Sequence, residues 1–319
     1  MIFENISSNS TNIEQIPLFF TVVIWINVVV LVFVLVFGFL GNFLTVVVMR
    51  LDNNLRPFTK TLLYMQAVWD TIVLLMPTIR YFFLFIYDIE IRSISPGFRI
   101  FHVFFTYLAF DCTAWNLCTL SLERMCLVVW PTKLFFKALS RKHSIIVTAI
   151  LILISCVLNT NIYFGDTFND MIVSYFLAVF AVFIPFVVIF FSSIIIFFKI
   201  RKSSDKVSGN SKSGNQNSSL FAIKMVVVTS LYYIFSACPF AIILILYNGH
   251  PYLFPDMYIF RCCFYSFCVL FVSNGSVKFY LYNLSTSHFK KILVGIYRRS
   301  RTGERTIQEK SSTTNTEIK

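Results

Sequence analysis

The sequence predicts an all-α membrane protein: a bundle of seven transmembrane helices, with a cytoplasmic amphipathic helix after the seventh span. Three observations predict this fold. Seven apolar runs are each long enough to cross a bilayer. Hydrophobic residues make up 57% of the 319 residues, and the mean hydropathy is +0.75, whereas a soluble domain of this size needs far more polar surface. The basic residues are concentrated in alternate loops, as membrane topology requires.

The seven apolar runs are the predicted spans, at residues 22–49, 60–86, 98–130, 142–162, 171–199, 220–248 and 258–283. A helix needs about 20 apolar residues to cross a bilayer, and each run reaches that length. The first, fifth and sixth runs contain charge-free stretches at 22–49, 171–198 and 225–247. Because lipid offers the backbone no hydrogen-bond partner, we expect these runs to be helical.

Lysine and arginine residues indicate the orientation. Residues 50–61, 131–143, 199–224 and the tail from residue 283 hold 21 of them, whereas the other loops and residues 1–21 hold only Arg92, Arg99 and Arg261. The positive-inside rule therefore predicts an extracellular N-terminus in the plasma membrane and a cytoplasmic C-terminus. Glycosylation sequons at Asn5 and Asn9 fall in the segment that this topology places outside.

Three regions follow from this topology: an extracellular tail at 1–21, a transmembrane domain at 22–299 and a disordered cytoplasmic tail at 300–319. Beyond the seventh span, apolar residues at helical spacing between basic residues predict a helix on the anionic inner leaflet: Phe289, Ile292, Leu293 and Ile296. The final tail is polar and rich in Ser and Thr, as disordered segments are. The loop at 203–219 is rich in Ser, Gly and Asn and is predicted to be flexible.

Several function classes are disfavoured by the sequence. The formal charge of +12 follows the membrane topology and so does not indicate a nucleic-acid partner. No spacing of Cys and His suits a metal ion, and no nucleophile–base or phosphate-binding arrangement is evident. We therefore expect a protein that is not an enzyme and that has no metal and no cofactor, with membrane lipid as a partner.

Short motifs occur in order along the spans. They are Gly41-Asn42 in the first, Ala67 and Asp70 in the second, Glu123-Arg124-Met125 with Pro131 after the third, Pro185 in the fifth, Pro239 in the sixth, and Lys278-Phe279-Tyr280-Leu281-Tyr282 followed by Phe289. In this order they resemble the rhodopsin-like family of G-protein-coupled receptors, over residues 41–299. The stretch from Asn274 to Tyr282 is similar to invertebrate neuropeptide receptors of the FMRFamide-receptor kind.

This resemblance implies a receptor that transmits an extracellular ligand signal, with a neuropeptide as the expected ligand, to a heterotrimeric G protein. In the family, the arginine at the Arg124 position turns from its acidic neighbour toward the G protein on activation. The resemblance assigns coupling and activation to Glu123, Arg124, Pro239 and Tyr282. The alternatives are an orphan chemoreceptor for small molecules and a multi-pass transporter or channel.

The sequence departs from the family at two places that concern activation. Arg99 stands where the family has the cysteine of its outer disulfide, and Ala237 stands where the sixth span has a tryptophan. In addition, no acidic residue lies near the inner end of the sixth span, at 219–224. A restraining bridge from Arg124 to that helix is therefore not expected, and we predict some signalling without ligand.

Few ionisable residues lie at membrane depth, where an unpaired charge is expensive. Asp70 is midway along the second span, and Lys278 is in the seventh where the family carries Asn or Asp. The resemblance implies that these positions face each other across a cavity that binds sodium in many relatives. We hypothesise that Lys278 pairs with Asp70 and replaces the sodium ion, with Asn42, Thr113 and Asn274 satisfying the other polar groups. The alternative is that Lys278 snorkels to the interface.

Four residues are candidates for the ligand pocket: Arg80, His102, Thr106 and Asp111. Thr106 stands where amine receptors place an Asp, which disfavours a bioamine ligand. Asp111 lies deeper, and is either the pocket floor or a structural acceptor. Seven acidic residues against three basic ones in the outer segments favour cationic ligands through electrostatic steering.

Overall fold

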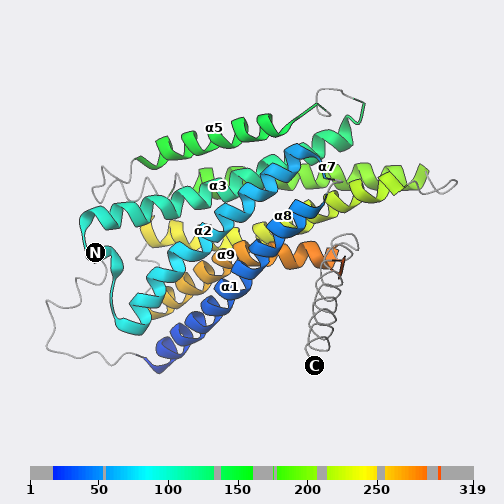
Figure 1. Ribbon diagram of the computed structural model, residues 1–319. Helices are drawn as coiled ribbons and strands as arrows, with labels where there is room; N and C mark the ends of the chain where they lie inside the picture. Colours follow the sequence, from blue (N-terminus) through cyan, green and yellow to red (C-terminus); the bar gives the residue numbers. More distant parts are fainter. Residues whose placement is uncertain are drawn as a thin grey trace, which may run out of the picture.

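The protein is a bundle of long helices that run roughly along one direction (Figure 1). The computed structural model describes residues 17–52, 55–132, 138–160, 175, 178–206, 214–249, 256–285 and 294–295. Within these ranges the side chains of 200–206, 214–227, 247–249 and 282–285 are not described. Every regular element in the described ranges is a helix, so the all-α prediction is confirmed there.

The described helices are α1 Leu18–Leu51, α2 Pro57–Tyr87, a short 3-10 helix η2 Ile91–Ser93, α3 Pro96–Val129, α5 Arg141–Asn159, a π-helical segment η4 Ala178–Phe183, α7 Ile184–Lys206, α8 Gly214–Gly249 and α9 Met257–Ser285. Consecutive long helices run in opposite directions (Figure 1). One end of the bundle therefore holds the start of α1 and α3 and the end of α2. We name it the Arg80 end, and the opposite end the Glu123 end.

Six membrane-length apolar helices are present in the described part of the chain: α1, α2, α5, η4 with α7, α8 and α9. These six match six of the seven predicted spans, as expected for a multi-pass membrane protein. The helix α3 matches the remaining predicted span in position and has 34 residues, but it is not among the six. Its buried residues explain this, because many of them are polar, including Thr106, Asp111, Asn116, Ser121 and Glu123.

The position of α3 explains how it can carry so many polar groups. It packs against α2, α5, α7 and α8, so protein surrounds much of its surface. Several of its polar side chains hydrogen-bond to other helices, as Asn116 does to α2 and Asp111 to α5. The helix α1 differs, since it exposes large apolar side chains such as Trp25, Phe33 and Phe43. Such a surface needs an apolar surrounding, which a bilayer supplies.

The described helices extend beyond some predicted boundaries. The predicted flexible loop at 203–219 is helical at both ends, because α7 continues to Lys206 and α8 begins at Gly214. A formed helix adds polar residues readily, since each one gains a backbone hydrogen bond without a new nucleation step. Likewise α1 begins at Leu18, inside the predicted tail. Asn5, Asn9, the tail at 300–319 and the surface-helix residues 289, 292, 293 and 296 lie outside the described residues.

Glycine allows α9 to approach α2 closely. A Cβ atom at Gly275 would lie 2.9 Å from the backbone oxygen of Asp70 and 3.2 Å from Leu74. A Cβ atom at Gly38 of α1 would lie 2.4 Å from Leu74 and 2.7 Å from Ser276. The three helices therefore meet around Leu74 only because two of the facing residues lack a side chain.

We expect Gly275→Ala to destabilise the protein by about 1–3 kcal/mol, because the backbone oxygen of Asp70 cannot move aside as a side chain could. Thermal unfolding of the purified protein in detergent measures this loss. Gly97→Ala is the matched control, since a Cβ atom there meets nothing within 4 Å. Equal melting temperatures for the two variants would contradict the close-approach argument.

Candidate functional site

A buried ion pair joins α2 to α9 in the middle of the bundle. The Nζ atom of Lys278 donates to Oδ1 of Asp70 at 2.6 Å. Both residues are sealed from solvent, with Asp70 1% exposed and Lys278 2% exposed. Lys278 therefore does not snorkel to the interface, and its ammonium group occupies the position beside Asp70 that the sequence led us to expect. A pair in this position compensates two charges that neither lipid nor protein would otherwise accept.

Neighbouring polar side chains complete the hydrogen bonding of Asp70. Gln66 donates to its Oδ1 at 2.9 Å and Thr113 donates to the same oxygen at 3.3 Å. Asn116 then donates to Oε1 of Gln66 at 2.8 Å and to the backbone oxygen of Leu62 at 2.8 Å. The network thus extends from α9 through α2 to α3.

The membership of this network differs in part from expectation. Asn42 donates to Oγ1 of Thr71 at 3.2 Å rather than to the ion pair. Asn274 is 3% exposed, and its Oδ1 has no hydrogen-bond partner in the described part of the chain. Gln66 and Asn116 take the supporting places instead. Gln66 could have been found from the sequence, because a residue four positions before Asp70 lies on the same helix face.

The carboxylate of Glu123 holds the end of α3 against the start of α2. Thr59 donates its hydroxyl to Glu123, with distances of 2.7 Å to Oε1 and 2.9 Å to Oε2. Arg56 approaches Oε1 at 3.5 Å, while Nε of Arg124 lies 3.9 Å from Oε2. The carboxylate is therefore bound more closely to α2 than to its own neighbour in the sequence.

Arg124 is buried without full satisfaction of its guanidinium group. The residue is 7% exposed, and its Nε and Nη2 atoms have no hydrogen-bond partner among the residues that the structure describes. Buried donors of this kind carry a desolvation cost that a new acceptor would relieve. The other two residues that the resemblance assigned to activation are Pro239, which lies inside α8, and Tyr282, which lies in α9. The side chain of Tyr282 is not among those that the structure describes.

A second polar cluster lies at the Arg80 end. Arg80 of α2 forms a two-pronged interaction with Glu90, in which Nε lies 3.0 Å and Nη2 lies 2.6 Å from Oε2. The backbone N–H of Arg92 also donates to Oε1 of Glu90, at 3.1 Å. The segment between α2 and α3 is therefore folded back onto α2 by its own carboxylate.

His102 links this segment to α3 as a neutral imidazole. Its Nδ1 accepts a hydrogen bond from Nε of Arg92 at 3.1 Å, so the proton must be on Nε2, which lies 2.9 Å from the backbone oxygen of Met76. Thr106 donates its hydroxyl to the backbone oxygen of His102 at 2.6 Å. Three of the predicted pocket residues, Arg80, His102 and Thr106, thus lie at the same end but are hydrogen-bonded within the protein.

Charges and burial in this cluster shift the pKa values of Glu90 and Arg92, the two members that lie between α2 and α3. Burial opposes ionisation of Glu90, but the hydrogen bonds and positive charge of Arg80 prevail and lower the pKa of the Glu90 carboxyl. Burial and, next, the positive charge of Arg80 lower the pKa of Arg92 to about 10. Arg92 stays protonated at neutral pH, although burial and the nearby charge of Arg80 disfavour its positive charge.

Asp111 lies apart from the other candidate pocket residues. It is 0% exposed, and its Oδ2 accepts a hydrogen bond of 2.7 Å from Asn159 of α5. Asn159 also donates to its own helix at the backbone oxygen of Ser155. Of the two roles considered for Asp111, this geometry matches the structural acceptor, which ties α5 to α3.

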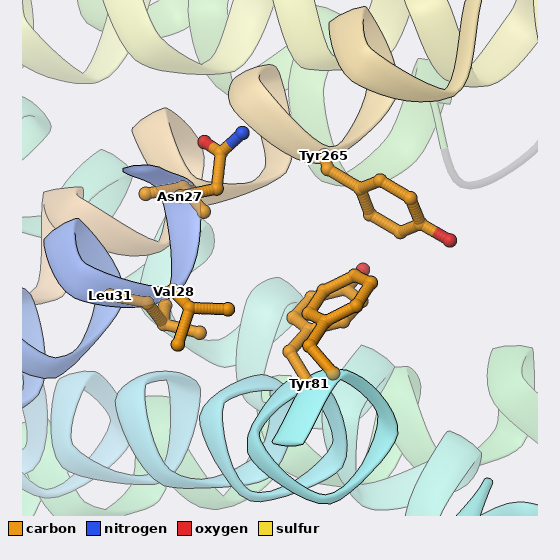
Figure 2. Close-up of a pocket in the computed structure, with 7 residues that line it drawn as sticks. Asn27, Val28, Leu31, Tyr81 and Tyr265 are labelled. Atoms are coloured by element: carbon orange, nitrogen blue, oxygen red, sulfur yellow. The ribbon is translucent and has the colours of Figure 1, made fainter. Parts of the chain in front are cut away.

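A small pocket opens between α1, α2 and α9 near the Arg80 end (Figure 2). The rings of Tyr81 and Tyr265 lie on one side of it and Asn27, Val28 and Leu31 of α1 lie on the other. Asn27 donates to Ser266 of α9 at 3.1 Å, and Tyr81 donates to Sγ of Cys268 at 3.4 Å. The pocket is mainly apolar, and none of the predicted pocket residues lines it.

No model of a known protein family matches this sequence, and no curated protein matches it. What the site can do must therefore be inferred from its own residues. All eight cysteines are free, including those nearest the Arg80 end, Cys262, Cys263 and Cys268. The helices at that end are held by the Arg80–Glu90 ion pair and the Arg92–His102 bond, without a disulfide.

We expect Asp70→Asn and Lys278→Met each to cost about 3–5 kcal/mol of unfolding free energy, because each leaves one buried charge without its partner. The double variant strands no charge, so it should lose much less than the sum of the two. Thermal unfolding of the three variants in detergent provides the double-mutant cycle. Additive losses would show that the two side chains do not stabilise each other.

Acidification should loosen the Arg80 end. Because the folded pKa of Glu90 is below its ordinary value of 4.5, its ion pair contributes fully above that pH and is lost as the pH falls through the folded pKa. The melting temperature should therefore fall more steeply with acid in the wild type than in Glu90→Gln. Parallel pH profiles for the two proteins would be inconsistent with this ion pair.

Proposed function

We propose that the protein is a rhodopsin-like G-protein-coupled receptor of the plasma membrane that signals the presence of an extracellular ligand, a neuropeptide. In this proposal α3 crosses the membrane together with the six apolar helices, which gives seven spans. The Arg80 end faces outward and receives the ligand. The Glu123 end faces the cytoplasm and binds a heterotrimeric G protein.

The incomplete hydrogen bonding of the Arg124 guanidinium is the main support for this proposal. Two nitrogen atoms of this buried guanidinium have no hydrogen-bond partner within the described residues, and its Nε lies 3.9 Å from Oε2 of Glu123. The side chain is therefore held weakly. A group in this condition can be offered to an acceptor on a partner protein after a small movement. This suits a two-state element whose populations a ligand shifts.

The distribution of charge supports the proposed orientation. The helix α1 ends at Leu51 and α2 begins at Pro57, so the basic segment 50–61 lies at the Glu123 end. Segment 131–143, between α3 and α5, belongs to the same end and is also basic. Positive loops remain in the cytoplasm during insertion, which agrees with G-protein binding at this end.

The direct experiment is to express the protein with a promiscuous G protein and to screen a neuropeptide library by calcium release. A peptide that activates the wild type should fail to activate Arg124→Gln when the two proteins are present at equal surface levels. Equal responses of both proteins would remove Arg124 from the coupling mechanism. Absence of any response across the library would count against a peptide receptor.

Basal signalling is a separate prediction. Because Glu123 is bound mainly to α2 and Arg124 is weakly held, the wild type should signal above empty cells without ligand, and Arg124→Gln should abolish this signal. A reporter assay at matched surface expression measures both. Basal output equal to that of empty cells would contradict a weakly restrained resting state.

A further inference from the structure

We propose that Arg92 is a binding residue for a carboxylate group of the ligand at the Arg80 end. Nε of Arg92 is committed to His102, and this is the one hydrogen bond that its side chain makes within the described residues. Arg92 is half-buried, and its Nη1 and Nη2 atoms are not among the fully buried polar atoms that lack partners. These two nitrogens therefore keep some exposure and make no hydrogen bond within the described residues.

The position of Arg92 is fixed before any ligand arrives. Its backbone N–H is bonded to Glu90, and its Nε is bonded to an imidazole that is itself anchored on Met76. Preorganisation of this kind reduces the entropy lost when a ligand binds. A guanidinium held by Nε presents its two terminal nitrogens as a fork, which matches the two oxygens of a carboxylate.

The charge balance around Arg92 favours an anion. Within the described residues, the charged groups with the largest effect on it are Arg80 and Glu90, and Glu90 already makes a two-pronged interaction with Arg80. The guanidinium of Arg92 makes no ion pair there, and His102 is neutral. A ligand carboxylate would give Arg92 a pair of its own.

Aromatic side chains define what should accompany the carboxylate. The ring of Phe98, which is 38% exposed, lies 6.2 Å from the imidazole of His102, the partner of Arg92, and Phe101, which is 48% exposed, lies beside Phe98. The ligand therefore carries its carboxylate next to an aromatic or large apolar group, as a peptide with a terminal phenylalanine does.

This inference names the ligand chemistry of the proposed receptor and in that respect rests on the proposed function. It also reconciles two charge patterns. Acidic residues in the outer segments attract a cationic ligand over a distance, whereas Arg92 binds an anionic group at close range. A peptide with basic side chains and a free carboxylate meets both conditions, and a peptide whose only carboxylate is amidated does not.

The test is a thermal shift of the purified full-length protein in detergent, which requires no G protein. The probes are N-acetylphenylalanine, N-acetylphenylalanine amide and N-acetylaspartylphenylalanine amide, each at about 20 mM. For a dissociation constant of about 1 mM, the bound carboxylate should raise the melting temperature by about 2–4 °C. The amide without a carboxylate should give no rise. A larger rise with the first probe identifies a terminal carboxylate, and one with the third an acidic side chain.

Three variants assign the effect to Arg92. Arg92→Gln should abolish the rise, and Arg92→Lys should retain part of it because the charge remains. Arg99→Gln is the matched control, since Arg99 is an exposed arginine at the same end, and it should behave as the wild type. The proposal is overturned by equal rises with the acid and the amide, by no rise with any probe, or by an unchanged rise in Arg92→Gln. Binding without signalling in cells would instead count against the receptor function alone.

Discussion

Polar side chains can lie inside an apolar helix bundle only where they find partners, and the architecture of this protein depends on that constraint. The ion pair between Asp70 and Lys278 is the clearest example, because leaving either charge without its partner would cost about 3–5 kcal/mol of stability. The pair requires close contact between α2 and α9, which Gly275 permits. The same requirement places α3 among α2, α5, α7 and α8, where its polar residues meet others.

The described side-chain hydrogen bonds between α3 and other helices are made mostly with α2. The helix α3 is hydrogen-bonded to α2 along its length, at His102, Thr113, Asn116 and Glu123. Its described side-chain contacts with α8 include Ser121 with Ser230, at 3.5 Å, and the edge-to-face rings of Phe110 and Phe240. The segment η4 meets α8 through a separate bond, from the Tyr233 hydroxyl to the backbone oxygen of Ala181 at 2.7 Å. We therefore expect α2 and α3 to move as one unit.

The sequence predicts much of the fold because hydrophobic length determines where helices lie in a membrane. All seven spans were predicted from apolar length, and the structure gives six helices of that composition, with α3 more polar than the other six. The Asp70–Lys278 pair was predicted because few charges lie at that depth, each needs a partner, and the family resemblance implied that the two positions face each other. The role of Gln66 could have been inferred from its position four residues before Asp70 on the same helix face, whereas that of Asn116 could not, since an uncharged amide on another helix gives no such signal. The hydrogen bond between Arg92 and His102 depends on how the segment between α2 and α3 folds back, and the spacing of residues in the sequence does not predict that.

We propose that α3 crosses the membrane although its composition is not that of an isolated span. Hydrogen bonds to α2 and α5 compensate several of its polar groups, and a seventh crossing would place the two termini on opposite sides. Epitope tags at the two termini test this directly in intact and permeabilised cells. The account predicts that antibody reaches the N-terminal tag on intact cells and the C-terminal tag only after permeabilisation. Labelling of both tags on intact cells, or of neither, would contradict it.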